Sequence, residues 1–197
     1  MATRPKALVL YWSATGNTMK VARAICAGLE QEGLSPVLVR VADAQDQELY
    51  DYDLVFLGAP SYQFLPPEPV LAFVKQKMRL HNQRGDIKLC APARPNKAAV
   101  VFCTYSGPHT GIDEATTSGK YLSQFFAHLG FPVVAEWYVV GEYHGSLEFS
   151  TKGKLGDIRG RPNTQDLTDI QTKTREVVSL WRQTWGNSHP HKETEET

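Results

Sequence analysis

The stretch from residue 11 to residue 18 constrains this chain most, because it joins a strand to a helix through small hydroxyl residues. The apolar run at residues 7–11 precedes it, and a helical pattern with Val21, Ile25 and Leu29 on one face follows it. Such a loop directs backbone N–H groups, hydroxyls and the positive helix end at one point, which suits a phosphate. An ordinary helix cap is the alternative, but one polar residue would suffice for it. The candidate phosphate-binding residues are Ser13, Ala14, Thr15, Gly16, Asn17 and Thr18.

Five apolar runs alternate with helical patterns along the rest of the chain. We expect strands at residues 7–12, 36–41, 54–58, 98–103 and 131–140. The first, third and fourth of these runs are apolar throughout, as in strands that are covered on both faces of a parallel sheet. The alternation predicts an α/β fold, a single doubly wound three-layer sandwich around a five-stranded parallel sheet.

The 197 residues are enough for one domain with a substantial core. We expect this domain to span residues 1–186 and the polar residues 187–197 to form a disordered tail. Two stretches, residues 79–97 and 141–162, look irregular and are long for connecting loops. The sequence does not assign a role to either of them.

The composition argues against a role in binding nucleic acid, membranes or metal ions. Lys plus Arg number 21 and Asp plus Glu also number 21, so bulk charge gives no reason to expect nucleic acid or a membrane surface as partner. No apolar run approaches the roughly 18–20 residues of a membrane helix. Cys26, Cys90 and Cys103 are scattered without a C-x-x-C motif, so we expect no metal site. The absence of a leader-like N-terminus and the scattered cysteines favour a reducing, cytoplasmic setting.

Two further loops are expected beside the phosphate loop, because ligands of open α/β sheets lie beyond the carboxyl ends of the strands. Each of these loops carries an aromatic residue among Gly, Pro and hydroxyl residues, which suits a phosphorylated planar molecule. Tyr105 either contacts one face of the planar ligand or lies at the rim of the site. Tyr62 and Phe64 are the two candidates for the opposite face, and either of them can instead pack within its loop. The candidate residues are Pro60, Ser61, Tyr62, Gln63, Phe64, Thr104, Tyr105, Ser106, Gly107, His109 and Gly111.

On the motifs Ser13-x-Thr15-Gly16-Asn17-Thr18 and Thr104-Tyr105-Ser106-Gly107, the chain resembles the flavodoxin family over roughly residues 6–185. The resemblance implies strand order 2-1-3-4-5 and noncovalent FMN. The phosphate would lie at residues 13–18, and the flavin ring between residues 61–64 and 104–107. Like the family, this phosphate loop contains no Lys or Arg, and the chain lacks the GxxxxGK[ST] motif of ATP- and GTP-binding proteins.

The resemblance implies an FMN-binding flavoprotein that moves electrons between a reductant, such as NAD(P)H or a redox protein, and an unidentified acceptor. Its partner is then a redox protein or a small-molecule acceptor. One alternative is an electron-transfer module with no small-molecule turnover of its own. Another is a non-redox scaffold for a different phosphate ligand or a protein. The sequence identifies no catalytic residue and leaves open whether the chain is an enzyme and how it oligomerises.

Overall fold

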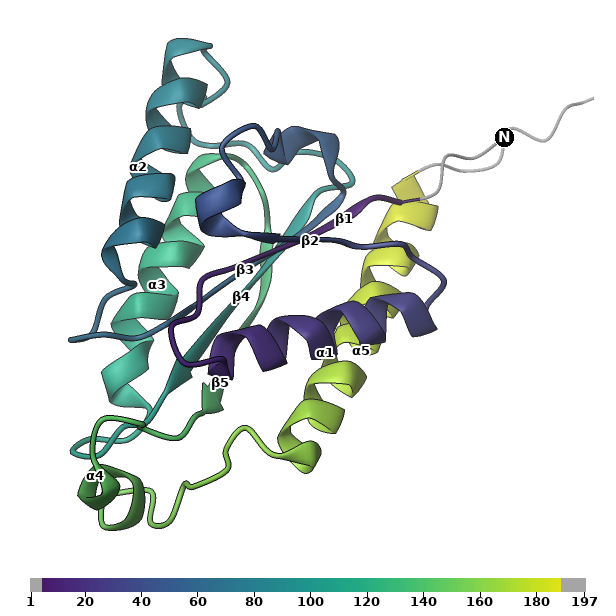
Figure 1. Cartoon of the computed structure of the whole chain (residues 1–197). Coiled ribbons are helices and arrows are strands. Elements are labelled where there is room, and N and C mark those ends of the chain that lie inside the picture. The colour runs from purple at the N-terminus through teal and green to yellow at the C-terminus, as the bar shows by residue number, and fades with distance from the viewer. Residues whose placement is uncertain (1–4, 189–197) are drawn as a thin grey trace, which may run out of the picture.

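The hydrophobic runs of the sequence form the strands of one sheet in the computed structural model, which describes residues 5–188 (Figure 1). The strands are β1 (Ala7–Tyr11), β2 (Val37–Arg40), β3 (Leu54–Pro60), β4 (Ala98–Tyr105) and β5 (Val133–Val140). All neighbouring pairs are parallel, and the order is β2-β1-β3-β4-β5. The three central strands are those with continuously apolar sequences, because both of their faces are covered. The structure confirms the predicted fold class and strand order.

Helices cover both faces of this sheet and complete three layers (Figure 1). They are α1 (Asn17–Gln31), α2 (Glu68–Gln83), α3 (Asp113–His128), α4 (Leu147–Thr151) and α5 (Thr164–Ser188). Helices α1 and α5 pack on one face around Phe56 and Phe102, and α2 and α3 pack on the other face with Phe73 and Phe126. None of the helices within residues 5–188 combines the length and the apolarity needed to cross a bilayer.

The structure departs from the sequence prediction at three places. Residues 79–83 continue α2, because His81 is fully buried and its Nδ1 lies 3.0 Å from Asp86 Oδ2. Residues 141–162 contain the short helix α4, whose start is capped by the Ser146 side chain. Helix α5 runs through residue 188, so the expected tail does not begin at 187; residues 189–197 lie outside the described part.

Three basic residues at the end of α2 and in the segment after it make contacts within the chain. Arg84 Nη1 lies 2.5 Å from Glu48 Oε2, and Lys97 Nζ lies 3.2 Å from Asp53 Oδ1. The Arg94 guanidinium lies 3.8 Å from the centre of the Tyr50 ring, within the range of a cation–π interaction. These contacts hold the segment against its own domain.

Helices α1 and α5 approach each other closely at Gly28, where a side chain would not fit. A Cβ atom at this position would lie 2.8 Å from both the carbonyl oxygen of Gln171 and the Cβ of Thr174. Thr174 is itself completely buried, and the Gln171 oxygen belongs to the backbone, so neither group can move aside easily. Glycine at position 28 therefore sets the distance between the two helices on this face.

We expect Gly28→Ala to lower the free energy of unfolding, measured by urea denaturation. Overpacking a well-packed contact costs about 1–3 kcal/mol, and this outweighs the gain of roughly 1 kcal/mol in helix propensity. Ser179→Ala, on the exposed face of α5, is the control in which only propensity changes. A Gly28→Ala variant as stable as the parent would show that the two helices can separate freely.

Candidate functional site

A cavity of about 750 Å³ opens at the edge of the sheet where the strands end, and Phe149 of α4 is among the residues that line it. Figure 1 shows α4 at this edge. All of the residues predicted from the three loops line this cavity except Gly16 and Gly111. The site predicted from the sequence did not include a second group that also lines it: Pro108, Glu114, Gly141, Glu142, Tyr143, His144, Gly145 and Phe149. Several of these directly follow β5. They could have been predicted by the same argument, that ligands lie beyond the carboxyl ends of the strands, applied to that strand as well.

Helix α1 begins at the cavity without a side-chain cap. Gly16 occupies the N-cap position with a φ of 98°, and no side chain within the described residues caps the helix there. Ser13 Oγ instead accepts a hydrogen bond from the Gly16 N–H at 3.0 Å. The first N–H groups of a helix have no partner inside the helix, and together with the helix dipole they favour an anion. A bound phosphate would therefore account for the unpaired N–H groups at this helix start, which an ordinary side-chain cap does not.

The buried polar side chains of the first turn hold the site together. Thr18 Oγ1 lies 2.8 Å from Thr104 Oγ1, which joins α1 to the end of β4. Asn17 Nδ2 donates to the carbonyl oxygen of Glu142 at 2.9 Å, whereas Asn17 Oδ1 is buried without a partner among the described residues. The exposed Thr15 is therefore the threonine of this loop whose hydroxyl is best placed to reach a ligand.

After β3, the chain makes a tight hairpin turn at the mouth of the cavity. Tyr62 and Leu65 exchange two backbone hydrogen bonds, of 2.8 and 3.1 Å. Between them, Gln63 and Phe64 have φ values of 47° and 72°, a left-handed conformation that is costly for residues other than glycine. The turn leaves Tyr62 46% and Phe64 56% exposed beside the cavity. The Trp12 ring contacts the Tyr62 ring edge-on, with the ring centres 5.9 Å apart.

The loop after β4 is folded back on itself and presents Tyr105 to the cavity. The Tyr105 side chain is partly buried, and this burial raises the pKa of its phenol. Gly107 has a φ of 52°, and a Cβ there would lie 2.5 Å from the carbonyl oxygen of Gly111. The Gly111 N–H in turn donates to the Gly107 carbonyl at 3.1 Å. Gly111 therefore closes the loop and does not line the cavity.

Glu114, near the start of α3, connects the loops after β3 and β4. Its Oε1 accepts hydrogen bonds from the backbone N–H groups of His109 and Thr110, both at 2.7 Å. Its backbone carbonyl accepts the hydroxyl of Ser61 at 2.6 Å. One residue thus fixes both of the loops that were expected to flank a ring. The contacts with His109 and Thr110 are local, whereas the contact with Ser61 joins residues that lie 53 positions apart and depends on the tertiary fold.

Residues 141–162, here called the α4 lobe, form a further wall of the cavity. The Gly141 N–H donates to the Tyr105 carbonyl and the Lys154 N–H to the Pro108 carbonyl, both at 2.8 Å. These bonds attach the lobe to the loop after β4 at two separate points. The lobe is therefore an ordered part of the site and not a loose connection between β5 and α5.

No Lys or Arg lines the cavity within the described residues, whereas the acidic residues Glu114 and Glu142 do. Glu142 Oε2 accepts a hydrogen bond from the Gly160 N–H at 2.8 Å. Positive potential at the site therefore comes chiefly from the start of α1, which carries about half a unit charge. An anionic group is expected to bind at that end, and the other end favours an uncharged ligand.

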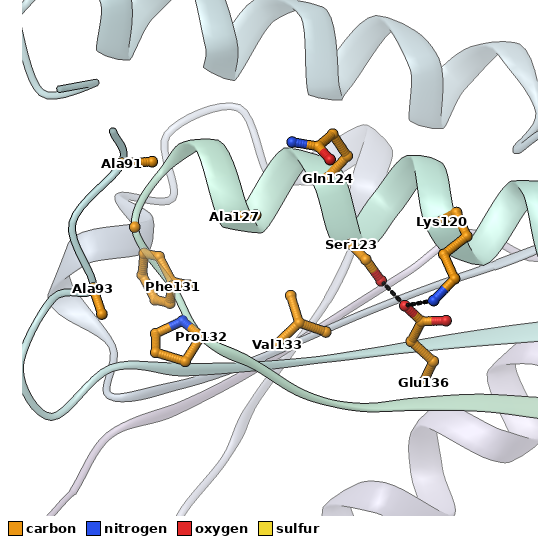
Figure 2. A pocket seen from close by; sticks show the side chains of 11 residues that line it. Ala91, Ala93, Lys120, Ser123, Gln124, Ala127, Phe131, Pro132, Val133 and Glu136 are labelled. Atoms are coloured by element: carbon orange, nitrogen blue, oxygen red, sulfur yellow. Dashed lines mark hydrogen bonds and ion pairs between the residues drawn. The ribbon is translucent and has the colours of Figure 1, made fainter. Parts of the chain in front are cut away.

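A second groove, of about 440 Å³, lies between α3 and β5 and shares no lining residue with the first cavity (Figure 2). Its polar centre is Glu136, whose Oε1 accepts from Ser123 Oγ at 2.7 Å and from Lys120 Nζ at 2.9 Å. These hydrogen bonds, together with one from the Tyr138 hydroxyl, lower the pKa of Glu136 in spite of its partial burial. Ser123 and Lys120 thus direct their polar groups to Glu136.

Comparison with known proteins adds independent observations. Residues 9–192 match the family described as Flavodoxin. A protein of Archaeoglobus fulgidus named NAD(P)H dehydrogenase (quinone) is 28% identical over 168 residues, which covers 71% of this chain and 83% of that protein. A flavodoxin of Clostridium beijerinckii is 38% identical over 50 residues, 25% of this chain and 36% of that protein.

Solved structures share the fold. A flavodoxin from the domain Archaea has a TM-score of 0.61 at 17% identity and covers 90% of this chain and 99% of its own. The rubredoxin:oxygen oxidoreductase of Desulfovibrio gigas has a TM-score of 0.62 at 19% identity and covers 91% of this chain but 36% of its own. At these identities the likeness concerns the arrangement of the sheet and helices.

Thr15 and Thr18 allow binding to be separated from stability. We expect Thr15→Ala to weaken FMN about ten- to a hundredfold, because a hydrogen bond to a charged acceptor contributes roughly 1.5–3 kcal/mol. We expect Thr18→Ala to lower the stability of the FMN-free protein by about 1–3 kcal/mol, because the buried Thr104 hydroxyl loses its partner. Flavin titration and urea denaturation measure the two effects.

Riboflavin, which has no phosphate, is the control ligand for both variants. Its affinity should stay unchanged in Thr15→Ala. If Thr15→Ala weakened FMN and riboflavin equally, the loop would support the fold and would not hold the phosphate.

Proposed function

The chain belongs to the flavodoxin family, and on this premise we propose that it is an FMN-dependent oxidoreductase that passes electrons from NAD(P)H to a small-molecule acceptor. FMN is the cofactor of the family, and electron transfer is its general activity. The observation that carries the proposal is the uncapped start of α1, which faces a cavity flanked by aromatic residues and free of Lys and Arg within the described part. A phosphate with an attached planar ring satisfies both features.

Bound FMN supplies the redox chemistry, since flavins accept and return electrons singly or as hydride. The residues of the chain hold and tune it. The N–H groups at the start of α1, with Ser13 and Thr15, would bind the phosphate, and Tyr62 and Tyr105 would flank the ring. Glu114 and Glu142 line the same cavity, and their negative charge would oppose the addition of electrons to a bound ring and would lower its reduction potential.

Two observations favour turnover of a small molecule. The α4 lobe closes one side of the cavity with Tyr143, His144 and Phe149, so the site is more enclosed than the three flavin loops would make it. The Archaeoglobus relative, which aligns over 83% of its length, is named for the reduction of quinones by NAD(P)H. A quinone is therefore the acceptor class that we propose to test first.

A second candidate function is an electron-transfer module that docks to another redox protein. The exposed apolar side chains of Tyr62, Phe64 and Leu65, on the turn at the mouth of the cavity, would suit such docking. The two functions differ in whether the protein alone oxidises NAD(P)H.

The proposal also places the protein in the cytoplasm. Cys26, Cys90 and Cys103 are free thiols, as expected in a reducing compartment. Burial raises the pKa of the Cys26 thiol to about 11 and that of Cys103 to about 12, so neither is a reactive thiolate at neutral pH.

The test is steady-state oxidation of NADH and NADPH by the FMN-loaded protein, with and without a quinone. We expect about one FMN per chain, tighter binding of FMN than of FAD, and quinone-dependent oxidation of at least one of the two cofactors. FAD should bind less well because the chain has no G-x-G-x-x-G motif for an adenosine half. Stoichiometric FMN without any NAD(P)H oxidation would favour the docking module, and no binding of FMN would refute both functions.

A further inference from the structure

The α4 lobe brings three aromatic rings together at the cavity. The Phe149 ring lies between the other two, with its centre 5.5 Å from that of Tyr143 and 5.4 Å from that of His109. The His109 ring meets Phe149 nearly perpendicularly, at 75°. All three residues line the cavity, and they come from two segments that are distant in the sequence. This group is here called the lobe cluster.

Backbone contacts fix the lobe cluster in place. The Ser150 hydroxyl, which is 1% exposed, donates to the Tyr143 carbonyl at 2.9 Å and accepts from the Tyr143 N–H at 3.1 Å. The Ser146 side chain caps the start of α4 by accepting from the Phe149 N–H at 3.3 Å. The positions of Tyr143 and Phe149 are therefore determined by the fold, and a ligand would meet a prepared surface.

A second aromatic surface lies across the mouth of the cavity. It consists of Tyr62 and Trp12, whose rings are in edge-to-face contact. Burial raises the pKa of the Tyr62 phenol, and the nearby Tyr143 phenol adds to this effect. The Tyr62 and Tyr143 side chains nevertheless remain 46% and 41% exposed. Because Tyr62 would flank the flavin ring, the partly exposed Tyr143 is the tyrosine left to stack on a second flat ring.

The charges around this part of the cavity select against anions. The lining residues that the structure describes include Glu114 and Glu142 but no Lys or Arg. The helix end that favours an anion lies at α1, where the phosphate of FMN is expected to bind. A second ligand that carried its own phosphates would meet these acidic residues, and the nearby Arg161, which acts on the pKa of Tyr105, is already paired with Asp166. An uncharged planar molecule avoids this penalty.

We propose that the lobe cluster of His109, Tyr143 and Phe149 forms a binding subsite for an uncharged planar electron acceptor of the quinone class. The inference rests on the proposed function, because it places an acceptor beside bound FMN. It adds the residues that bind the acceptor and requires that acceptor to be uncharged and planar. The phosphates of NAD(P)H would have to be bound outside this cluster.

The test measures binding of 2,3-dimethyl-1,4-naphthoquinone to the oxidised, FMN-loaded protein by titration calorimetry. This quinone is substituted at both positions where a thiol such as the exposed Cys90 could add. We expect Tyr143→Ala and Phe149→Ala each to weaken the quinone roughly three- to tenfold, because each removes one aromatic contact. Tyr143→Phe should retain most of the affinity, since it keeps the ring.

Leu147→Ala is the matched control, because Leu147 lies in the same helix, is 70% exposed and is not among the residues that line the cavity. It should leave quinone binding unchanged. FMN affinity, measured in parallel, should change less than twofold in all four variants.

Three results would overturn the subsite. They are an unchanged quinone affinity in Tyr143→Ala and Phe149→Ala, a loss of FMN affinity that accounts for the whole effect, or a loss of NADP⁺ binding in place of quinone binding. The proposed function fails separately, if the parent protein does not bind FMN or does not oxidise NAD(P)H. A parent that turns over quinone while both alanine variants bind it normally would leave the function intact and refute the subsite alone.

Discussion

The start of helix α1 is the constraint on which the site depends. Gly16 leads into the helix in a left-handed conformation, and no side chain within the described residues caps the first N–H groups. Strand β1 is buried along its whole length, so the position of this helix end is fixed by the core of the sheet. The buried bond between Thr18 and Thr104 then ties it to the end of β4. An anion is the group that best completes this arrangement.

Much of the fold and part of the site could be predicted from local sequence patterns. Continuous apolar runs identified the central strands, and the loops that follow β1, β3 and β4 could be located because parallel strands end at one edge. The family resemblance supplied the strand order. The same argument applied to β5 would have located residues 141–145 of the α4 lobe, but helix α4 itself could not be predicted, because it has only five residues and depends on the bonds of Ser146 and Ser150. The roles of Asn17 and Glu114 were also hidden, since their partners lie far away in the sequence or on other loops.

The α4 lobe gives this chain features beyond those of a phosphate loop and two ring-binding loops. It is attached to the phosphate end through Asn17 and to the ring end through Tyr105 and Pro108, so cofactor and lobe share structural contacts. It also adds the aromatic side chains of Tyr143 and Phe149 to those that the loops after β3 and β4 bring to the cavity. In our account the α1 end recognises the phosphate, the loops after β3 and β4 hold the ring, and the lobe determines which molecule reaches it.

The central claim is that the phosphate is held by the N–H groups and hydroxyls at the start of α1 and not by a cation. The most direct measurement compares the dissociation constants of FMN and riboflavin at low and at high ionic strength. Several charge-assisted hydrogen bonds of roughly 1.5–3 kcal/mol each predict that FMN binds at least about a hundredfold more tightly. The ratio should persist in high salt, because short bonds in a partly enclosed site are little screened. Equal affinities, or a ratio that disappears in salt, would contradict the account.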